Sequence, residues 1–184
     1  MPERLPRVTL VLGGARSGKS AHAEALVEGA AGACFYLATA EAGDAEMAER
    51  IAAHRARRGG RWRTLEEPLD LAGALTRGVP SEAGREPEPV GAILVDCLTL
   101  WLANLLGAGR DPAAETRRLL EALPGVAAPV VFVSNEVGLG IVPTSALGRR
   151  FRDEAGRLNQ AVAAAADRVV FVAAGLPLVL KSTP

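Results

Sequence analysis

The residues Gly13 to Ser20, with the sequence GGARSGKS, match the phosphate-binding pattern G-x-x-x-x-G-K-[ST]. The apolar run 8–12 before them predicts a buried strand, and the run 21–27 after them predicts a helix. Glycines let the backbone wrap closely enough for its N–H groups to point at phosphate oxygens, and a helix N-terminus adds partial positive charge. The sequence therefore predicts that this chain binds a nucleoside triphosphate.

Each position of this phosphate loop has an expected role. We expect Lys19 to act catalytically by reaching the β- and γ-phosphates, and the Ser20 hydroxyl to ligate Mg²⁺. The remaining positions supply backbone N–H groups or the space that the phosphates need. These positions are Gly13, Gly14, Ala15, Arg16, Ser17 and Gly18.

A second element of the phosphate site is predicted at Asp96. The apolar, β-branched run 92–95 is typical of a buried strand, and Asp96 ends that strand. In P-loop proteins a carboxylate at the C-terminal end of a neighbouring strand holds Mg²⁺ directly or through water. Alternatively, Asp96 caps the helix expected over 97–106, and the two roles are compatible.

The segment around His54 has two interpretations. A helix is predicted over 44–58, and His54 extends the apolar face of that helix. A histidine in such a position is commonly a core residue that is hydrogen-bonded to a neighbour. Alternatively, a neutral imidazole beside Arg55, Arg57 and Arg58 attacks the α-phosphorus of a bound triphosphate.

Apolar runs and helical patterns alternate along the whole chain. Strands are predicted at 8–12, 33–38, 61–66, 92–96, 130–134, 168–173 and 178–181, and the main helices at 21–27, 44–58, 69–77, 97–106, 112–123 and 145–167. This alternation predicts an α/β fold with a mostly parallel sheet, helices on both faces and a C-terminal antiparallel strand. With the phosphate loop, we expect one domain over 1–184, a P-loop (RecA-like) three-layer sandwich.

Composition excludes several classes of partner. Basic and acidic residues balance at 21 each, so no global field recruits nucleic acid or a membrane surface. The two cysteines, Cys34 and Cys97, suggest no disulfide framework, which fits a reduced, cytoplasmic setting. Residues 1–7 lack the apolar core of a signal peptide, and the longest apolar run, 169–180, is too short to span a bilayer.

Longer blocks of the sequence resemble one enzyme family. The blocks are GGARSGKS at 13–20, RIAAHRARR at 50–58, WRTLE at 62–66, LVDCLT at 94–99, SNEVGLGIVP at 134–143 and FRDEAGRLNQAVAAAAD at 151–167. Together they resemble the bifunctional adenosylcobinamide kinase / adenosylcobinamide-phosphate guanylyltransferases of cobalamin biosynthesis, over nearly the whole chain. The blocks at 134–143 and 151–167 are far more specific than the phosphate loop alone.

The resemblance implies two reactions at one site. A nucleoside triphosphate, ATP or GTP with Mg²⁺, phosphorylates the aminopropanol hydroxyl of adenosylcobinamide. A histidine that falls on His54 then attacks GTP, and the GMP passes to adenosylcobinamide phosphate, giving adenosylcobinamide-GDP and pyrophosphate. The resemblance thus favours the nucleophile over the core histidine. It also implies a homotrimer with active sites near subunit contacts.

The same resemblance implies which residues surround the nucleotide. Besides the phosphate loop and Asp96, they are Thr39, Ala40, Glu41, Arg55, Ala56, Arg57, Arg58 and Glu66. Taken alone, Glu66 is more commonly the partner of a nearby arginine. The other histidine, His22, is not expected to react, because its helix directs its N-terminus and not its body at the ligand. The sequence departs from the family at Gly59 and Gly60, where members often carry proline.

Two other interpretations are open. A simple small-molecule kinase would use the same loop and Mg²⁺ without histidine chemistry. A nucleotide-dependent switch would need loops that order on the γ-phosphate and a protein partner. For the kinase step, Asp96 and Glu136 are candidate bases by position only. The loop at Asn135 with the arginines at 149–152 is the candidate surface for the corrinoid.

Overall fold

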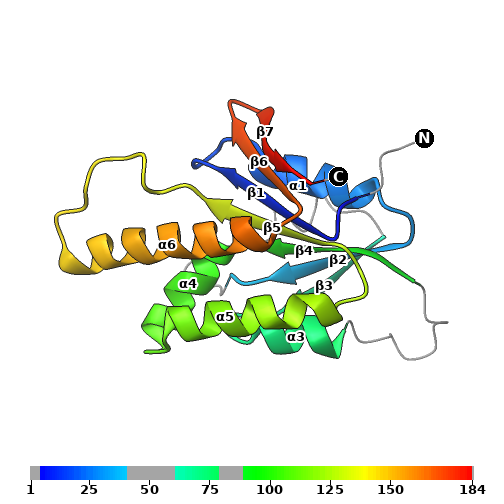
Figure 1. The fold of residues 1–184 in the computed structure, drawn as a ribbon, viewed down its shortest axis with the longest axis horizontal. Coiled ribbons are helices and arrows are strands. Elements are labelled where there is room, and N and C mark those ends of the chain that lie inside the picture. The colour runs from blue at the N-terminus through cyan, green and yellow to red at the C-terminus, as the bar shows by residue number, and fades with distance from the viewer. Residues whose placement is uncertain (1–4, 41–60, 79–88, 184) are drawn as a thin grey trace.

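The computed structural model of the chain describes residues 5–40, 61–78 and 89–183. These residues form strands that are mostly separated by helices (Figure 1). The strands are β1 (Val8–Gly13), β2 (Ala33–Ala38), β3 (Trp62–Glu66), β4 (Val90–Asp96), β5 (Val130–Asn135), β6 (Arg168–Ala173) and β7 (Leu176–Ser182). The helices are α1 (Lys19–Glu28), α3 (Leu71–Arg77), α4 (Leu98–Gly107), α5 (Pro112–Ala122) and α6 (Ala146–Ala165), with a 3-10 turn η1 (Leu123–Gly125).

The strands form one sheet of seven, in the order β3-β2-β4-β5-β1-β6-β7. All neighbouring pairs are parallel except β6 and β7, which pair antiparallel. The prediction of a mostly parallel sheet with a C-terminal antiparallel strand is confirmed. The strand predicted at 61–66 is β3, and it lies at one edge of this sheet.

Helices cover both faces of the sheet and make a three-layer sandwich (Figure 1). Side chains alternate along β1, so that Leu10 and Leu12 face one side and Val11 faces the other. Leu10 and Leu12 pack with residues of α3, α4, α5 and α6, whereas Val11 packs with α1. Because both faces of this parallel sheet are apolar, each face needs a layer of helices to cover it. The P-loop α/β fold predicted from the sequence is therefore confirmed.

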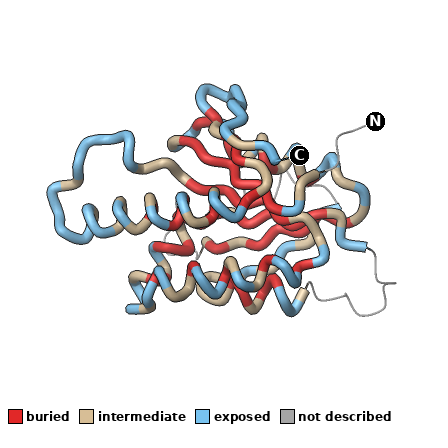
Figure 2. Tube along the Cα trace, viewed as in Figure 1, coloured by how far each residue is buried: buried red, intermediate tan, exposed pale blue. Residues whose placement is uncertain are grey.

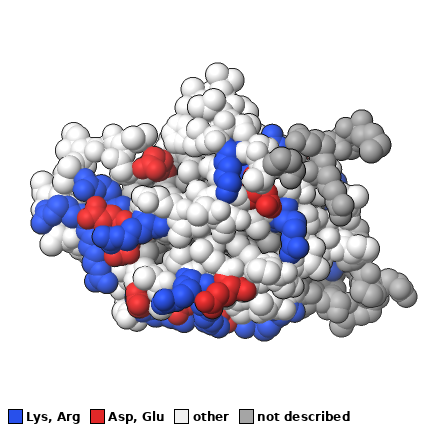
Figure 3. Space-filling view, in the orientation of Figure 1, with Lys and Arg blue, Asp and Glu red and all other residues white. Residues whose placement is uncertain are grey.

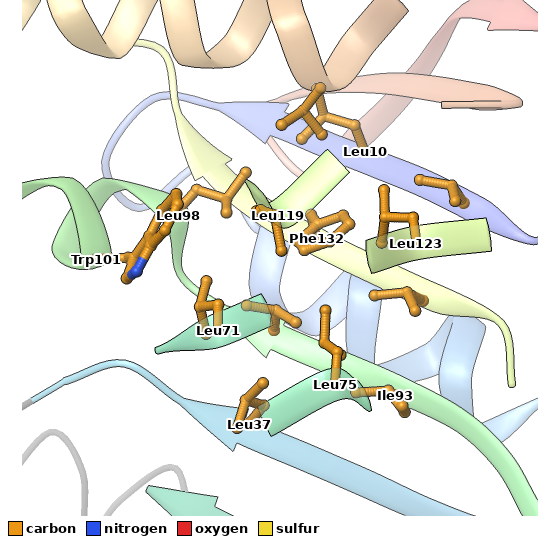
Figure 4. Close-up of a cluster of buried hydrophobic side chains, with 14 of the residues drawn as sticks. Leu10, Leu37, Leu71, Leu75, Ile93, Leu98, Trp101, Leu119, Leu123 and Phe132 are labelled. Atoms are coloured by element: carbon orange, nitrogen blue, oxygen red, sulfur yellow. The ribbon is translucent and has the colours of Figure 1, made fainter. Parts of the chain in front are cut away.

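The larger core lies between the sheet and the helices α3 to α6 (Figure 4). Phe132 of β5 and Trp101 of α4 are its largest fully buried side chains. Each side chain of this size stabilises the fold by about 2 to 3 kcal/mol through burial alone. The indole Nε1 of Trp101 donates to the carbonyl of Leu69 at 2.9 Å, so the core also fixes the loop before α3.

Local capping explains where two helices begin. The pattern predicts the start of α3 at residue 69, but the helix starts at Leu71, because the Asp70 carboxylate accepts the N–H of Gly73 at 3.0 Å. α6 starts after Ser145, whose hydroxyl accepts the N–H of Gly148 at 3.0 Å. The predicted helix at 44–58 lies outside the described residues.

α6 has two halves with different surroundings. Its buried residues, from Ala155 to Val162, pack on the sheet, while its first turns project beyond it (Figures 1 and 2). The projecting half carries a dense mixture of Arg, Asp and Glu side chains, whereas the β6–β7 end is uncharged in the same view (Figure 3). The described part of the chain contains no helix that is long and apolar enough to cross a membrane.

Candidate active site

The phosphate loop connects β1 to α1 as the sequence predicts. Its backbone reverses through Arg16, at a φ of 56°, and Gly18, at a φ of 93°. The N–H of Ser17 donates back to the carbonyl of Gly14 at 3.3 Å. α1 then begins at Lys19, so the positive end of the helix opens onto the loop. This is the backbone geometry that an anionic phosphate requires.

The loop is held from two sides by the ends of other strands. The N–H of Glu136, after β5, donates to the carbonyl of Gly13 at 3.1 Å. The N–H of Gly175, in the β6–β7 turn, donates to the carbonyl of Ser17 at 2.8 Å. A Cβ on Gly18 would lie 3.1 Å from Cα of Gly175, and a Cβ on Gly13 would lie 2.5 Å from the Val172 carbonyl oxygen. Both glycines are therefore required by the close approach of β6 and its turn.

Lys19 is almost fully buried beneath this loop. Its Nζ donates to the carbonyl of Gly14 at 3.1 Å. Burial lowers the pKa of Lys19, and the negative charge of the nearby Asp96 opposes that shift. The ammonium thus lies between the phosphate loop and the end of β4, where the negative charge of a phosphate would compensate for its burial.

Asp96 ends β4, and its side chain is bound by a neighbouring strand. The phenol of Tyr36, on β2, donates to Oδ2 of Asp96 at 3.2 Å. The Tyr36 ring packs edge-on against Trp62, with ring centroids 6.3 Å apart, and the Trp62 indole donates to the Glu28 carboxylate at 2.9 Å. Cys97, and not Asp96, occupies the N-cap position of α4.

The strand register places Glu66, Ala38 and Asp96 in one row across β3, β2 and β4. Residues paired in this way project from the same face of a parallel sheet, here the face covered by α1. Neighbouring strands lie about 4.8 Å apart, so the Cα atoms of Glu66 and Asp96 are roughly 10 Å from each other. Glu66 and Asp96, which were predicted from separate motifs, thus lie on one face of the sheet at the C-terminal ends of their strands.

Thr39 and Ala40 follow β2 at that same edge. The Thr39 hydroxyl donates to the carbonyl of Cys97 at 2.8 Å and accepts the N–H of Cys97 at 2.7 Å. The amide of Asn104 donates to the Thr39 carbonyl at 2.8 Å. Thr39 is fully buried, so its side chain ties the end of β2 to the end of β4, while Ala40 is half-buried.

The two cysteines are buried and free, in agreement with the expected absence of a disulfide framework. Burial, reinforced by the neighbouring Asp96, raises the pKa of the Cys97 thiol to about 11. Cys97 therefore stays protonated at neutral pH and contributes no thiolate to the site.

Several predicted site residues lie outside the described residues. They are Glu41, His54, Arg55, Ala56, Arg57 and Arg58.

The other histidine, His22, lies in α1 and is half-buried. Burial lowers the pKa of His22, and the positive charge of Arg168 lowers it further.

The oxygen groups at this edge fit a magnesium ion that is shared with a triphosphate. Asp96 offers a carboxylate and Ser20, in the first turn of α1, offers a hydroxyl. Mg²⁺ prefers such oxygen ligands and completes its shell with water and substrate phosphates, so it needs only one or two protein groups. Within the described ranges, no three His, Cys, Asp or Glu side chains form a metal cage.

The sequence did not reveal a group of buried polar side chains behind the site. Thr99 of α4, Ser134 of β5 and Asn159 of α6 are each less than 9% exposed. The Ser134 hydroxyl donates to Oδ1 of Asn159 at 2.6 Å, and Nδ2 of Asn159 donates to the Asn135 carbonyl at 3.2 Å. Each of these polar residues interrupts an apolar run, and this pattern could have marked them as buried. The sequence does not say which of them form hydrogen bonds with one another.

Comparison with known proteins assigns the site to a family. The family model described as cobinamide kinase / cobinamide phosphate guanyltransferase matches residues 9–180. The bifunctional adenosylcobalamin biosynthesis protein CobP of Pseudomonas aeruginosa is 53% identical, covering 95% of this chain and 98% of the relative. The corresponding CobU proteins of Escherichia coli and Salmonella typhimurium are 42% and 43% identical, each covering 94% of this chain and 98% of the relative.

Solved structures of distant sequence share the fold. A protein from Pyrococcus horikoshii gives a TM-score of 0.54 at 11% identity, covering 99% of this chain and 89% of its own. The flagellar accessory protein FlaH of Methanocaldococcus jannaschii gives 0.52 at 10% identity, covering 97% and 80%. These similarities concern the fold alone. Because the family model and the bifunctional relatives cover nearly the full chain, this protein belongs to the cobinamide kinase / cobinamide phosphate guanyltransferase family of bifunctional enzymes in adenosylcobalamin biosynthesis.

Proposed function

We propose that the chain catalyses two successive transfers, with Mg²⁺ and a nucleoside triphosphate bound at the phosphate loop. The observation that carries this proposal is the position of Lys19, buried under the loop beside Asp96. The family description supports cobinamide and then cobinamide phosphate as the substrates, and we propose that the protein uses their adenosyl forms.

In the first transfer, the aminopropanol hydroxyl oxygen attacks the γ-phosphorus of ATP or GTP. The bond from the γ-phosphorus to the β–γ bridging oxygen breaks, the nucleoside diphosphate leaves, and the hydroxyl proton passes to a base or to water. Lys19 and the N–H groups of the loop stabilise the charge on the phosphate oxygens. When bound, Mg²⁺ held by Ser20 and Asp96 neutralises further phosphate charge.

In the second transfer, an imidazole nitrogen of His54 attacks the α-phosphorus of GTP and displaces pyrophosphate. A phosphate oxygen of adenosylcobinamide phosphate then attacks the same phosphorus, which releases the imidazole and yields adenosylcobinamide-GDP. An imidazole is nucleophilic near neutral pH without a separate base. The arginines at 55, 57 and 58 follow His54 directly in the sequence, and we propose that they neutralise the α-phosphate and pyrophosphate.

The deciding experiment uses the two histidines of the chain as a matched pair. The protein is incubated with α-labelled GTP and Mg²⁺, denatured, and examined for label on the polypeptide. We expect acid-labile, alkali-stable label on the wild type and on His22→Ala, and none on His54→Ala. If wild-type protein binds GTP but acquires no label at any Mg²⁺ concentration, the guanylyl-histidine is wrong, and the simple kinase is the better interpretation.

We further propose that the protein assembles as a homotrimer, as the resemblance of its sequence implies. Exposed apolar side chains support self-association. They are Leu139, Ile141, Val142 and Leu147 between β5 and the start of α6, and Leu176, Leu178, Val179 and Leu180 of β7. Gly175, next to β7, contacts the phosphate loop, so an interface there would adjoin the active site. The test is to measure the mass of the protein in solution by analytical ultracentrifugation, for wild type and for the double variant Leu176→Ser, Leu178→Ser. A monomeric wild type would contradict the proposal.

A further inference from the structure

The C-terminal end of β5 extends beyond the end of its neighbour β4. β4 pairs with β5 only as far as Asp96 opposite Val133, whereas β1 pairs with β5 as far as Gly13 opposite Asn135. In a parallel ladder, the N–H and C=O groups of one residue point to one side, and those of the next residue point to the other. The backbone groups of Asn135 on the β4 side therefore need partners from elsewhere.

Side chains from two helices provide these partners. Oγ1 of Thr99, in α4, accepts the N–H of Asn135 at 2.7 Å. Nδ2 of Asn159, in α6, donates to the carbonyl of Asn135 at 3.2 Å. Thr99 and Asn159 thus replace the missing strand for this one residue.

The Ser134 hydroxyl joins the two helices to each other. It donates to Oδ1 of Asn159 at 2.6 Å and lies 3.4 Å from Oγ1 of Thr99. All three side chains are more than nine-tenths buried, and the hydrogen bonds satisfy their polar atoms. The group is fixed in one arrangement because each member would lose a hydrogen bond if another moved.

The other side of the same segment holds the phosphate loop. The residue after Asn135 is Glu136, whose N–H donates to the carbonyl of Gly13, the first residue of the loop. A continuous set of hydrogen bonds therefore runs from Asn159 in α6, through the end of β5, to the start of the phosphate loop. Moving Asn135 would move Glu136 and release the Gly13 carbonyl.

We infer that Thr99, Ser134 and Asn159 are positioning residues for nucleotide binding: they hold the end of β5 so that Glu136 keeps the phosphate loop in its binding geometry. None of the three needs to touch the nucleotide. The inference rests on the proposed function only in that the loop binds a nucleoside triphosphate.

Substitutions at Thr99 test the inference, with Thr116 as the matched control. Thr116 is equally buried, but its hydroxyl donates to the Pro112 carbonyl within its own helix, α5. Thr99→Val and Thr116→Val each remove one buried hydroxyl, so both are expected to lower the melting temperature. Thr99→Ser keeps the oxygen and serves as the rescue variant. Asn159→Asp keeps the volume but cannot donate to the Asn135 carbonyl.

The readout is the equilibrium dissociation constant of a fluorescent GTP analogue with Mg²⁺, together with hydrogen exchange of the peptides covering 130–140. We expect Thr99→Val and Asn159→Asp to weaken binding about tenfold, which corresponds to losing about one well-placed hydrogen bond. Exchange at residues 135 and 136 should accelerate in the same variants. Thr99→Ser and Thr116→Val should keep wild-type affinity and exchange there.

Each outcome has a separate meaning. If Thr99→Val and Asn159→Asp bind the analogue as tightly as Thr116→Val, the positioning role is wrong and the group only stabilises the fold. If wild type itself fails to bind the analogue, the proposed function fails and the exchange data alone decide the structural link. Should Thr99→Val not fold, Asn159→Asp carries the same comparison.

Discussion

The phenol of Tyr36 donates a hydrogen bond of 3.2 Å to Oδ2 of Asp96, and this contact joins β2 to the predicted magnesium ligand on β4. One carboxylate oxygen is thereby directed toward the phenol, which fixes the rotation of the whole group. Trp62 packs against the Tyr36 ring, so the phenol is itself held in place. Tyr36 therefore helps to fix the orientation of the Asp96 carboxylate, whose charge acts on Lys19.

Removing the phenol should change the magnesium requirement. In Tyr36→Phe, the ring still packs, but Asp96 loses its orienting donor, at a cost to stability of about 1 kcal/mol. We expect a several-fold higher Mg²⁺ concentration for half-maximal kinase activity. The control is Trp62→Phe, which loses the hydrogen bond to Glu28 but keeps an aromatic ring beside Tyr36. Equal magnesium curves for wild type and Tyr36→Phe would contradict this role.

The two lysines of the chain offer a direct test of the phosphate loop. Lys19→Met removes the buried ammonium and should lower kinase turnover by two orders of magnitude or more, about 3 kcal/mol of transition-state stabilisation. Burying the Lys19 ammonium costs folding free energy, and Lys19→Met removes that cost. The free energy of unfolding of Lys19→Met should therefore be no lower than that of wild type. Turnover and denaturant unfolding are measured together.

Lys181→Met is the control for that substitution. The Lys181 ammonium donates to the carbonyls of Ala163 and Ala164 near the end of α6, far from the loop in sequence. Its loss should cost up to about 1 kcal/mol of stability and leave turnover unchanged. Equal turnover of Lys19→Met and Lys181→Met would refute a role for Lys19.

Glycine-to-alanine substitutions should have opposite effects at two positions. Gly18 has a φ of 93° and lies against Gly175, so an alanine there would strain the phosphate loop. We expect Gly18→Ala to bind nucleotide more weakly and to lower the free energy of unfolding by about 1 kcal/mol or more. Gly156 lies inside α6, and an added Cβ would meet no atom within 4 Å. Gly156→Ala should therefore stabilise the protein by about 0.5 to 1 kcal/mol. Thermal unfolding of both variants gives the comparison, and a destabilised Gly156→Ala would contradict it.

Asp70 should make stability depend on pH in the acid range. Burial alone would raise its pKa, but hydrogen bonds from Arg77 and from the N–H of Gly73, with the charges of Arg118 and Arg77, lower it overall. The folded state then binds fewer protons than the unfolded state, so stability is present above the unfolded value of 3.8 and is lost as the pH falls through the lower folded pKa.

Asp70→Asn tests that linkage. The asparagine still caps α3, but it loses the charge, so its unfolding free energy should fall less steeply below pH 4 than that of wild type, by about 1 kcal/mol or less. Asp153→Asn is the control, because the carboxylate of Asp153 is half exposed and pairs with the adjacent Arg152. Denaturant unfolding from pH 5 down to pH 2.5 separates the two; parallel curves for Asp70→Asn and wild type would disprove the linkage.

The fold was predictable because its signals are local. The strand–loop–helix around Gly13 to Ser20 and the apolar runs of β4 and β5 each occupy a few consecutive residues, and short runs decide whether a segment forms a strand. The position of Asp96 at a strand end followed from the same runs. The N-cap position of α4, at Cys97 and not at Asp96, did not follow from them, because a helix start depends on the local backbone conformation.

The contacts between distant segments were not predictable from the chain. Tyr36 meets Asp96 across 60 residues, and Asn159 meets Ser134 only because α6 crosses the end of β5. Such side-chain contacts depend on strand register and on the placement of helices, and no single segment of the sequence determines either of these. His54 was assigned through the resemblance and lies outside the described residues, so its role stays a prediction.

The strand that carries the phosphate loop has a consequence for synthesis. β1 precedes its two neighbours in the sheet, β5 and β6, by more than 110 residues of chain (Val8 against Val130 and Arg168), so it is translated well before them. The chain through β6 must therefore leave the ribosome before the phosphate loop has both of its neighbouring strands. Until β5 and β6 are made, the apolar β1 has no strand to pair with, and unpaired apolar strands of this kind are prone to aggregate during folding.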